Sequence, residues 1–273
     1  MFAKQEERST ASDKGSAVAR FCKHTLAVAE VELIKLLRDP TELFTRAVQP
    51  VLWIVIFGQV FSRARGVPTG NISYLAFMTP GILAQSVLFS AIFYGIAVIW
   101  ERDLGILHKM LVSPAYRAAL VLGKALSSGL RGISQTIIIY LIALVMHIPV
   151  RLEFLAITEV LFAVVLGSAI FSTFSLIIAC VVKTRERFMG IGQVMTMPLF
   201  FASNAIYPLE LMPRWLRVIA LGNPLTYLVD ALRGLMITGG VTTSGYAVDF
   251  AVLAVVFLAM LATASRIYQT LAK

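Results

Sequence analysis

Residues 154–182 read FLAITEVLFAVVLGSAIFSTFSLIIACVV, and this stretch decides the class of the protein. It contains a single charged residue, Glu159, close to its beginning. A helix of about 20 consecutive apolar residues is long enough to cross the roughly 30 Å hydrocarbon core of a bilayer. The stretch therefore predicts a transmembrane helix.

Further apolar runs of this kind occur along the chain, at about residues 43–61, 74–99, 126–147, 188–206 and 247–267. Of all 273 residues, 58% are apolar and 14% are charged, whereas soluble domains carry about 25% charged residues. One water-soluble core of this size has no room for so much apolar surface. We therefore expect an all-α integral membrane protein with six transmembrane helices, its transmembrane domain covering residues 43–273.

The N-terminal part has a different composition. Residues 1–17 are polar and rich in Ser, Lys and Glu, which predicts a disordered cytoplasmic tail. Residues 18–42 carry apolar side chains at helical spacing, with Lys23 and Glu30 on another face. Because so much membrane follows, we expect this amphipathic helix to lie in the membrane interface. The alternative is a helix packed on a soluble domain.

The net charge of +9 lies mainly in short segments beside the apolar runs. Basic loops of this kind set the orientation of membrane proteins, so we expect the bilayer, and not nucleic acid, as the partner of these charges. If both termini are cytoplasmic, 17 of the 24 Lys and Arg residues lie inside and six lie outside, with Arg131 inside the third span. This asymmetry predicts a multi-pass protein with both termini in the cytoplasm.

The loop after the second span is the most informative one. Residues 100–114 read WERDLGILHKMLVSP, with charges at the start, an apolar stripe after them, and a Ser-Pro stop. A short amphipathic helix here, within a loop that extends over 100–124, transmits movement if a soluble partner binds its charged end. An ordinary capped loop fits the spacing equally well.

Two groups of residues resemble a known family. Glu101-Arg102-Asp103, then Gly105 and Leu107, and then the LVSP of 111–114 are similar to the loop signature of type-2 ABC transporter permeases. That family includes drug-resistance, nodulation-factor and polysaccharide export permeases. The second group is PLFFASNAIYP at 198–208, MPRWL at 212–216, NPLTY at 223–227 and DALR at 230–233. The chain departs from the usual pattern at Asp103, Ile106 and His108, where the family commonly has Glu, Thr and an acid.

The resemblance implies a half-transporter of the bacterial or archaeal plasma (inner) membrane. Two permease copies, most simply a homodimer, pair above two separate ABC ATPase subunits, which bind ATP and magnesium. The coupling residues that it implies are Glu101, Arg102, Asp103, Leu104, Gly105, Leu107 and His108. This chain is not expected to be an enzyme or to hold a cofactor or metal, since it contains no Gly-x-x-x-x-Gly-Lys-Ser/Thr motif and no cluster of catalytic side chains.

The resemblance also implies that residues 208–238 form a pair of short helices that re-enter the outer leaflet. An independent argument supports this, because irregular backbone at membrane depth is tolerated only where protein or water covers it, and three prolines interrupt this half-apolar stretch. A plain extracellular loop is the alternative. The expected gate residues are Pro208, Pro213, Trp215, Asn223 and Pro224.

Polar side chains within the apolar runs are candidates for a transport pathway. They include Gln85, Gln135, Thr173, Gln193 and Asn204. Polar groups in membranes prefer the interior of a helix bundle, but small and polar residues also serve helix–helix packing, which is the alternative for each of them. The centres of the predicted spans carry no Asp, Glu or Lys, which argues against coupling to protons or sodium.

We therefore expect an ATP-driven export permease that moves a lipid-like, drug-like or glycoconjugate cargo out of the cytoplasm. The alternative from another class is a secondary transporter or channel, which needs an intramembrane charge or an internal repeat. A membrane-embedded enzyme needs clustered acids, histidines or cysteines near the interface. The sequence displays none of these features.

Overall fold

The computed structural model describes residues 48–63, 72–104, 117–182 and 184–267, together with positions 25–26, 30–31, 34, 38 and 45. Within these ranges the chain forms helices and turns and no β-strand, apart from one antiparallel bridge between Val150 and Ile237. The predicted all-α class is confirmed for this part of the chain. The predicted tail (1–17) and most of the predicted interface helix (18–42) lie outside the described residues.

Long helices form the body of the molecule: α4 (Tyr74–Asp103), α6 (Arg117–Val145), α7 (Phe154–Val181) and α11 (Tyr246–Ile267). Each contains an apolar segment long enough to cross a membrane. The shorter elements are η1 (Trp53–Phe57), α3 (Gly58–Arg63), α8 (Arg185–Phe201), η2 (Leu209–Leu211), α9 (Arg214–Leu221) and α10 (Pro224–Met236).

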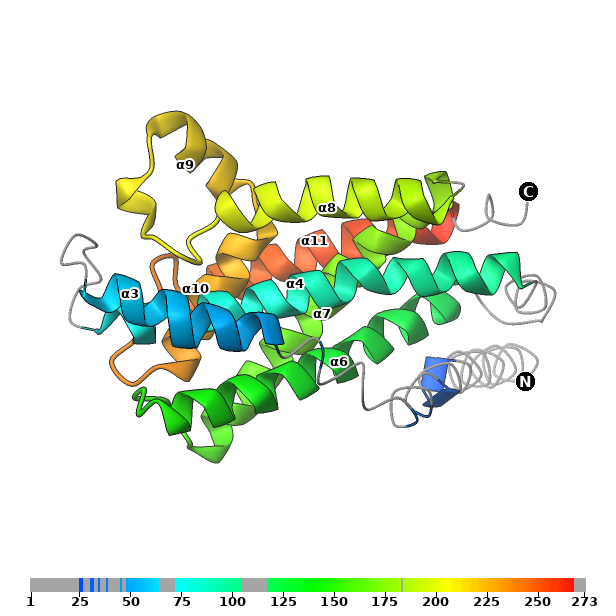
Figure 1. Ribbon diagram of the computed structural model, residues 1–273. Coiled ribbons are helices and arrows are strands. Elements are labelled where there is room, and N and C mark those ends of the chain that lie inside the picture. Colours follow the sequence, from blue (N-terminus) through cyan, green and yellow to red (C-terminus); the bar gives the residue numbers. More distant parts are fainter. Residues whose placement is uncertain are drawn as a thin grey trace, which may run out of the picture.

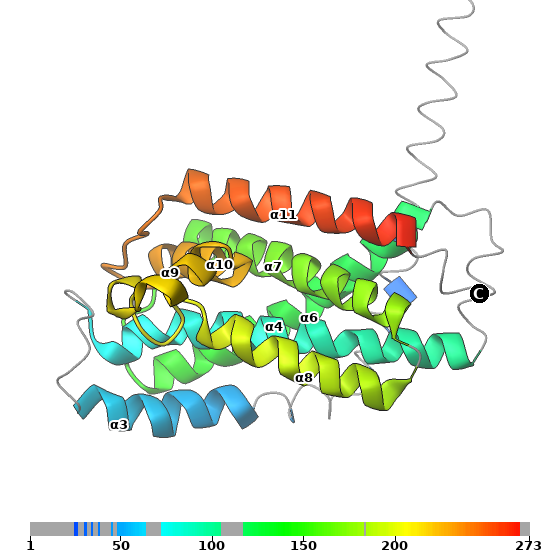
Figure 2. The same ribbon diagram turned by 90° about the horizontal axis from the view of Figure 1, so that it is seen from above.

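The long helices run side by side along one direction (Figure 1). Helix α7 lies centrally and packs against α4, α6 and α11, while α4 also contacts α6, α8 and α10. Seen from above, α11 and α3 occupy opposite edges of the bundle (Figure 2). The end of α4 and the start of α8 lie at one end of the bundle, and α9 and α10 lie at the other (Figure 1).

Small residues bring α4 and α7 close together. A side chain at Gly95 would place its Cβ 2.5 Å from a ring carbon of Phe188 and closer still to the Ser175 hydroxyl. The same hydroxyl donates a hydrogen bond to the carbonyl of Ile92 and accepts one from the Gly95 amide at 3.1 Å. Such contacts between small residues are typical of helix packing in membranes, where the lipid gives helices no hydrophobic reason to associate.

The helix ends differ from the hydropathy limits at the loop that follows the second span. Helix α4 continues through the charged residues to Asp103, and α6 already begins at Arg117, although its apolar run begins at about Leu126. Hydropathy marks where a helix can contact lipid, whereas the helical backbone continues until a breaking residue or a turn ends it. The middle of the predicted coupling loop, residues 105–116, lies outside the described residues.

The described helices match the six predicted spans to different extents. Four of the predicted spans correspond to helices that are long and apolar enough. The first corresponds to a shorter apolar helix over Val48–Ser62, and the fifth ends at Phe201 and not at about Ile206. This fifth helix, α8, contains Pro198 and ends at Phe201, because residues 202–208 form turns. The crossing of the membrane by all six segments therefore stays a prediction.

Candidate functional site

A cluster of charged and aromatic side chains joins the last turn of α4 to the start of α8. The carboxylate of Asp103 accepts hydrogen bonds from Arg185 (Nη2 to Oδ2, 2.9 Å) and from Arg102 (3.3 Å). The guanidinium of Arg185 also lies over the Trp100 ring, 3.4 Å from its centroid. Arg102 donates to the carbonyl of Val182 at 3.3 Å. The end of α4 is therefore attached to the turn between α7 and α8.

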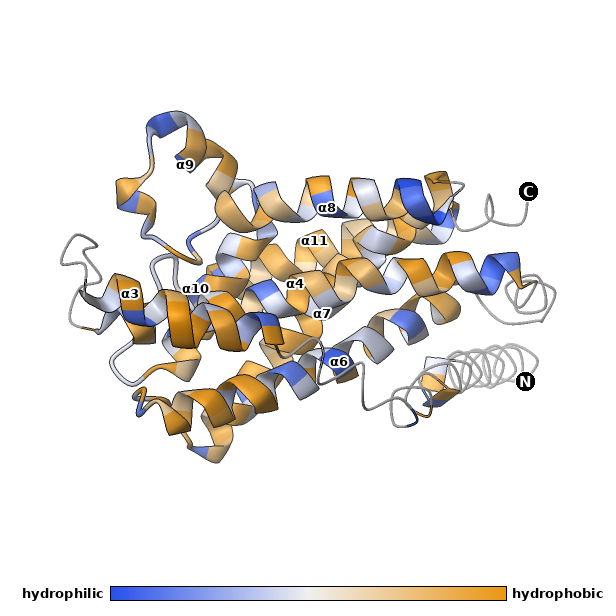
Figure 3. Ribbon diagram, in the orientation of Figure 1, coloured by the Kyte–Doolittle hydropathy of each residue, from blue (hydrophilic) through white to orange (hydrophobic). Residues whose placement is uncertain are grey.

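This cluster is partly open to solvent. The side chains of Arg185 and Asp103 are 32% and 38% exposed, and an ion pair this exposed contributes at most about 1 kcal/mol to stability. Its importance is positional, because it fixes the relative placement of two helix ends. The hydrophilic colour at this end, against the apolar middle of the bundle, is seen in Figure 3.

A buried ion pair adjoins this cluster, because Glu101 directly precedes Arg102 in α4. The Nζ atom of Lys124, on α6, is 2.5 Å from Oε2 of Glu101, on α4, and the two side chains are 1% and 7% exposed. The Tyr94 ring lies next to the pair, 5.8 Å from Lys124 Nζ and 4.6 Å from the Arg131 guanidinium carbon. The charged end of α4 is therefore attached to α6 as well as to α8.

The expected coupling residues divide into three groups. Glu101 faces the bundle, whereas Arg102, Asp103 and Leu104 are partly or fully exposed, with Leu104 66% exposed. Gly105, Leu107 and His108 lie outside the described residues. The sequence places Glu101 at the charged start of the loop, where a partner is expected to bind. In the structure its carboxylate instead faces the bundle and pairs with Lys124.

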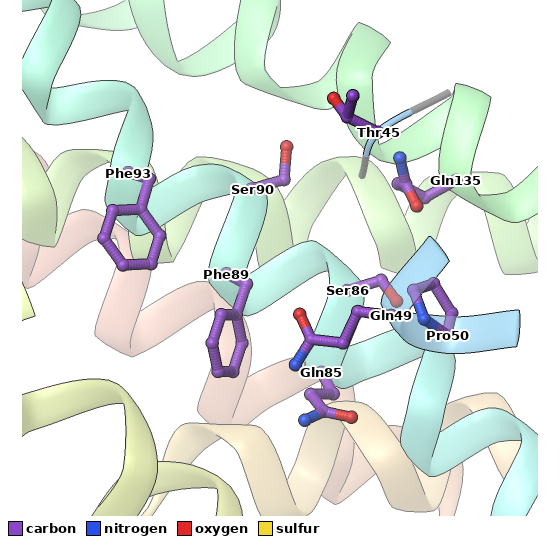
Figure 4. Close-up of a pocket in the computed structure, with 9 residues that line it drawn as sticks. All are labelled: Thr45, Gln49, Pro50, Gln85, Ser86, Phe89, Ser90, Phe93 and Gln135. Atoms are coloured by element: carbon purple, nitrogen blue, oxygen red, sulfur yellow. The ribbon is translucent and has the colours of Figure 1, made fainter. Parts of the chain in front are cut away.

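A polar cavity of about 420 Å³ opens between α4, α6 and the segment that leads into η1. Two of the predicted pathway residues, Gln85 and Gln135, both line it (Figure 4). Among the described residues, the others that line it are Thr45, Gln49, Pro50, Ser86, Phe89, Ser90 and Phe93. The structure thus brings together side chains from separate segments of the sequence.

The other candidate pathway residues lie elsewhere. Thr173 is buried on α7 and donates to the carbonyl of Ala169 at 2.7 Å, which is a bond within its own helix. Gln193 is exposed on α8, and Asn204 is buried in the turn that follows α8. None of these three lines the polar cavity, and their role in a pathway stays a prediction.

At the opposite end, the expected gate residues shape the turns around α9 and α10. Pro208 and Pro213 precede η2 and α9, and Trp215 on α9 is 67% exposed. Asn223 caps α10, where its Oδ1 accepts a hydrogen bond from the Leu225 amide at 3.0 Å, and Pro224 follows at the first helical position, which proline favours. The short helices α9 and α10 therefore lie within 208–238, where a pair of short helices was expected. Their depth in the membrane stays a prediction.

Asn223 also ties α10 to the end of α8. Its Nδ2 donates to the carbonyls of Leu199 and Ala202, at 2.7 and 2.8 Å. We expect Asn223→Ser to retain the cap, which serine also provides, but to lose both donated bonds, and Asn223→Ala to lose all three. Buried hydrogen bonds contribute about 1 kcal/mol each, so thermal melting of the purified chain should rank the unsubstituted protein first, Ser second and Ala last. Equal melting of the two variants would show that the cap contributes nothing and that the two donated bonds alone matter.

Sequence reasoning missed a buried charged group near this end. Arg233, on α10, is 5% exposed and donates to the Asn204 carbonyl at 2.6 Å, with its guanidinium carbon 3.8 Å from the centroid of the Phe77 ring. Asp230, one turn earlier, accepts from the amides of Thr243 and Ser244, both at 2.8 Å. The signal in the sequence is two charges three residues apart, Asp230 and Arg233, within the stretch 208–238 that was expected to form two short re-entrant helices.

Comparisons with known proteins identify related membrane proteins. The model of the ABC-2 type transporter family matches residues 23–237. The putative transport permease ycf38 of Cyanophora paradoxa is 29% identical over 227 residues, covering 81% of this chain and 77% of the relative. The probable doxorubicin resistance ABC transporter permease protein DrrC of Mycobacterium tuberculosis is 25% identical over 227 residues, covering 83% and 81%.

A third relative, the inner membrane transport permease YadH of Escherichia coli, is 26% identical over 221 residues, which cover 75% of this chain and 82% of the relative. The family match, over residues 23–237, includes both groups of residues on which the sequence resemblance rests. Together with the long apolar helices, it establishes the class of the protein. The chain belongs to the ABC-2 type transporter family and is a membrane permease.

Proposed function

We propose that this permease is one membrane half of an ATP-driven exporter of the plasma (inner) membrane. Two copies, most simply a homodimer, pair within the bilayer, and two ABC ATPase subunits bind below them. The cargo leaves the cytoplasm and is lipid-like, drug-like or a glycoconjugate. Family membership supports the association with an ATPase, and the names of relatives, which mention doxorubicin resistance and the inner membrane, support the direction and the location.

The observation that carries the proposal is the attachment of the end of α4 to α6 and α8 through ion pairs. The partly exposed Arg102 and the exposed Asp103 and Leu104 lead directly into the segment that resembles a coupling helix. Behind them, the Glu101–Lys124 pair holds α6, and the Asp103–Arg185 pair holds α8. A displacement applied at this end therefore moves several helices together, as an ATPase stroke requires.

The proposed orientation rests on the distribution of Lys and Arg along the sequence. Both termini and the charged end of α4 lie on the cytoplasmic side, and α9 and α10 lie towards the outside, where the gate residues close the pathway. ATP and Mg²⁺ are bound by the partner subunits. The part that this chain plays is mechanical, and it consists of receiving force at the end of α4 and rearranging the helices around the cargo.

Reversal of the charge at Asp103 tests the proposal. We expect Asp103→Lys to leave the chain folded, because the ion pair is exposed, but to reduce the ATPase activity of the assembled complex at least tenfold, since the new Lys repels Arg185 and Arg102. The complex would be purified through a tag on this chain, the bound ATPase subunit identified by its mass, and ATP hydrolysis measured in lipid nanodiscs.

The matched control is Glu153→Lys, a charge reversal at an exposed residue just before α7, at the opposite end of the bundle. It should hydrolyse ATP at the unsubstituted rate. Equal activity of the two variants would remove the role of the α4 end. If no ATPase subunit accompanies the tagged chain from its native membrane, the proposed function itself is wrong.

A further inference from the structure

A groove separate from the polar cavity lies between the start of α7, the end of α10 and the start of α11, and we call it the α7–α11 groove. Its volume of about 540 Å³ lies within the range of roughly 300–1,000 Å³ that is usual for small-molecule sites. Its described lining combines two charged residues, Arg151 and Glu159, with two aromatic ones, Phe162 and Phe250. Helix α11 lies beside α7 at the edge of the bundle opposite α3 (Figure 2), so the groove belongs to the outer side of the bundle.

The two charged side chains are accessible and unpaired. Arg151 is half-buried and Glu159 is exposed. Neither side chain forms a hydrogen bond or ion pair with the other or with any other described residue, and only the backbone amide of Arg151 is bonded, to the Met236 carbonyl at 2.8 Å. The groove therefore presents one positive and one negative group to whatever enters it.

The position of Glu159 makes a partner necessary. It is the single charged residue of α7 and lies five residues after Phe154, with which the helix begins. At 1.5 Å per residue this is about 7.5 Å along the helix, whereas the headgroup region on one side of a bilayer is about 5–7 Å thick. The side chains of Leu155 and Phe162 beside it are apolar and exposed, as expected of a lipid-facing surface. A carboxylate at this depth is costly unless a cation accompanies it.

The groove changes from polar to apolar along both helices. Phe162 follows Glu159 by three residues on α7, and Phe250 follows Tyr246 by four on α11, so each phenylalanine lies about one turn further into the bundle. The two phenylalanine rings contact each other, with centroids 5.7 Å apart and planes inclined by 40°. Tyrosine is favoured at the level of the lipid headgroups. Charges and a tyrosine at the end of the helices, followed by an aromatic wall, match an amphiphile with a polar head and a hydrocarbon chain.

We infer that the α7–α11 groove binds a zwitterionic phospholipid with a primary ammonium, phosphatidylethanolamine. The phosphate pairs with Arg151, the ammonium donates to the Glu159 carboxylate, and an acyl chain packs on Phe162 and Phe250. An anionic phospholipid satisfies Arg151 but is repelled by Glu159, and a soluble zwitterion leaves the aromatic wall uncovered. The inference goes beyond the proposed function, because the lipid is a bound neighbour of the helices and its binding requires neither a cargo nor an ATPase subunit.

The test titrates the full chain, purified in a non-ionic detergent, with dioleoyl phosphatidylethanolamine or dioleoyl phosphatidylglycerol. These lipids share the acyl chains and the phosphate, and only the first carries an ammonium. Native mass spectrometry of the complexes gives the Kd of the first bound lipid, which should be at least fivefold lower for phosphatidylethanolamine. Equal affinities, or a preference for phosphatidylglycerol, would overturn the inference. Glycerophosphoethanolamine, which lacks acyl chains, should not displace the bound lipid at equal concentration, and displacement would show a site for a soluble zwitterion instead.

Charge reversal at Glu159 locates the binding. Glu159→Lys gives the groove two cations and should invert the selectivity, so that phosphatidylglycerol binds at least fivefold more tightly than phosphatidylethanolamine. Glu159→Gln keeps the size of the side chain and should bring the two affinities within twofold of each other, and it decides the question if the Lys variant is not monodisperse. An unchanged preference for phosphatidylethanolamine in the monodisperse variants would place the lipid elsewhere and refute the inference.

The matched control is Glu153→Lys. It makes the same change of charge at an exposed residue just before α7 that does not line the groove. This variant should keep the fivefold preference for phosphatidylethanolamine. If it inverts the selectivity as Glu159→Lys does, the general charge of this end of the bundle selects the lipid, and the groove does not.

Discussion

The Lys124→Met variant is expected to melt far below the unsubstituted permease. The substitution keeps an unbranched side chain of similar length but removes the ammonium that lies 2.5 Å from the Glu101 carboxylate, at a site where both side chains are buried. Removing one partner of a buried ion pair typically costs about 3–5 kcal/mol, because the other charge stays buried. The measurement is the fraction of monodisperse protein that survives heating, by size-exclusion chromatography.

Two further variants interpret this result. Glu101→Gln combined with Lys124→Met removes both charges and should recover much of the lost stability, since no carboxylate is then left without its ammonium. Arg187→Met removes an exposed positive charge on α8 and should melt normally. If Lys124→Met melts like Arg187→Met, the pair does not hold α4 and α6 together.

The membrane class was predictable because it depends on composition alone. Long apolar runs such as 154–182 have no stable place in water, and the corresponding helix α7 begins and ends within one residue of the expected limits. The ends of α4 and α6 were not predictable from hydropathy, because these helices continue into polar sequence. Where a helix leaves the apolar layer and where its backbone stops are two separate properties.

The polar face of α6 shows what a closer reading of the sequence offers. Its buried polar residues recur at helical spacing on one side: Lys124, Ser127, Ser128, Arg131 and Gln135. The opposite side exposes Ile137, Leu141 and Leu144. This is the reverse of a soluble amphipathic helix and is what lipid requires, because polar groups then turn towards the protein. The periodicity identifies the buried face, although the partner of Lys124 needed the fold.

The candidate site was predictable in parts and not as an assembly. Gln85 and Gln135 were singled out because polar side chains in apolar runs are unusual, but 50 residues separate them and only the packing of α4 on α6 brings them to one cavity. Thr173 and Gln193 gave the same signal in the sequence and lie elsewhere. The type of residue therefore selects candidates, and the tertiary fold decides which of them meet.

The second large effect is expected at Gly81. This residue lies in the first half of α4, where a Cβ atom would come 2.7 Å from both the carbonyl carbon and the Cα of Ala205, and closer still to the Ala205 oxygen. Backbone cannot swing aside as a long side chain does, so Gly81→Ala must displace the turn at 202–208. Overpacking of this kind costs about 1–3 kcal/mol or more.

The displacement also affects two hydrogen bonds that attach the same turn to the bundle. Arg233 donates to the Asn204 carbonyl, and the Tyr74 hydroxyl donates to the Ile206 carbonyl at 3.2 Å. Hydrogen exchange of the amides in 202–208 should therefore accelerate in Gly81→Ala, together with a lower melting temperature. Gly190→Ala is the control, since no atom lies within 4 Å of its added Cβ and alanine is the better helix former. If both variants exchange and melt like the unsubstituted chain, α4 does not hold this turn by close backbone contact.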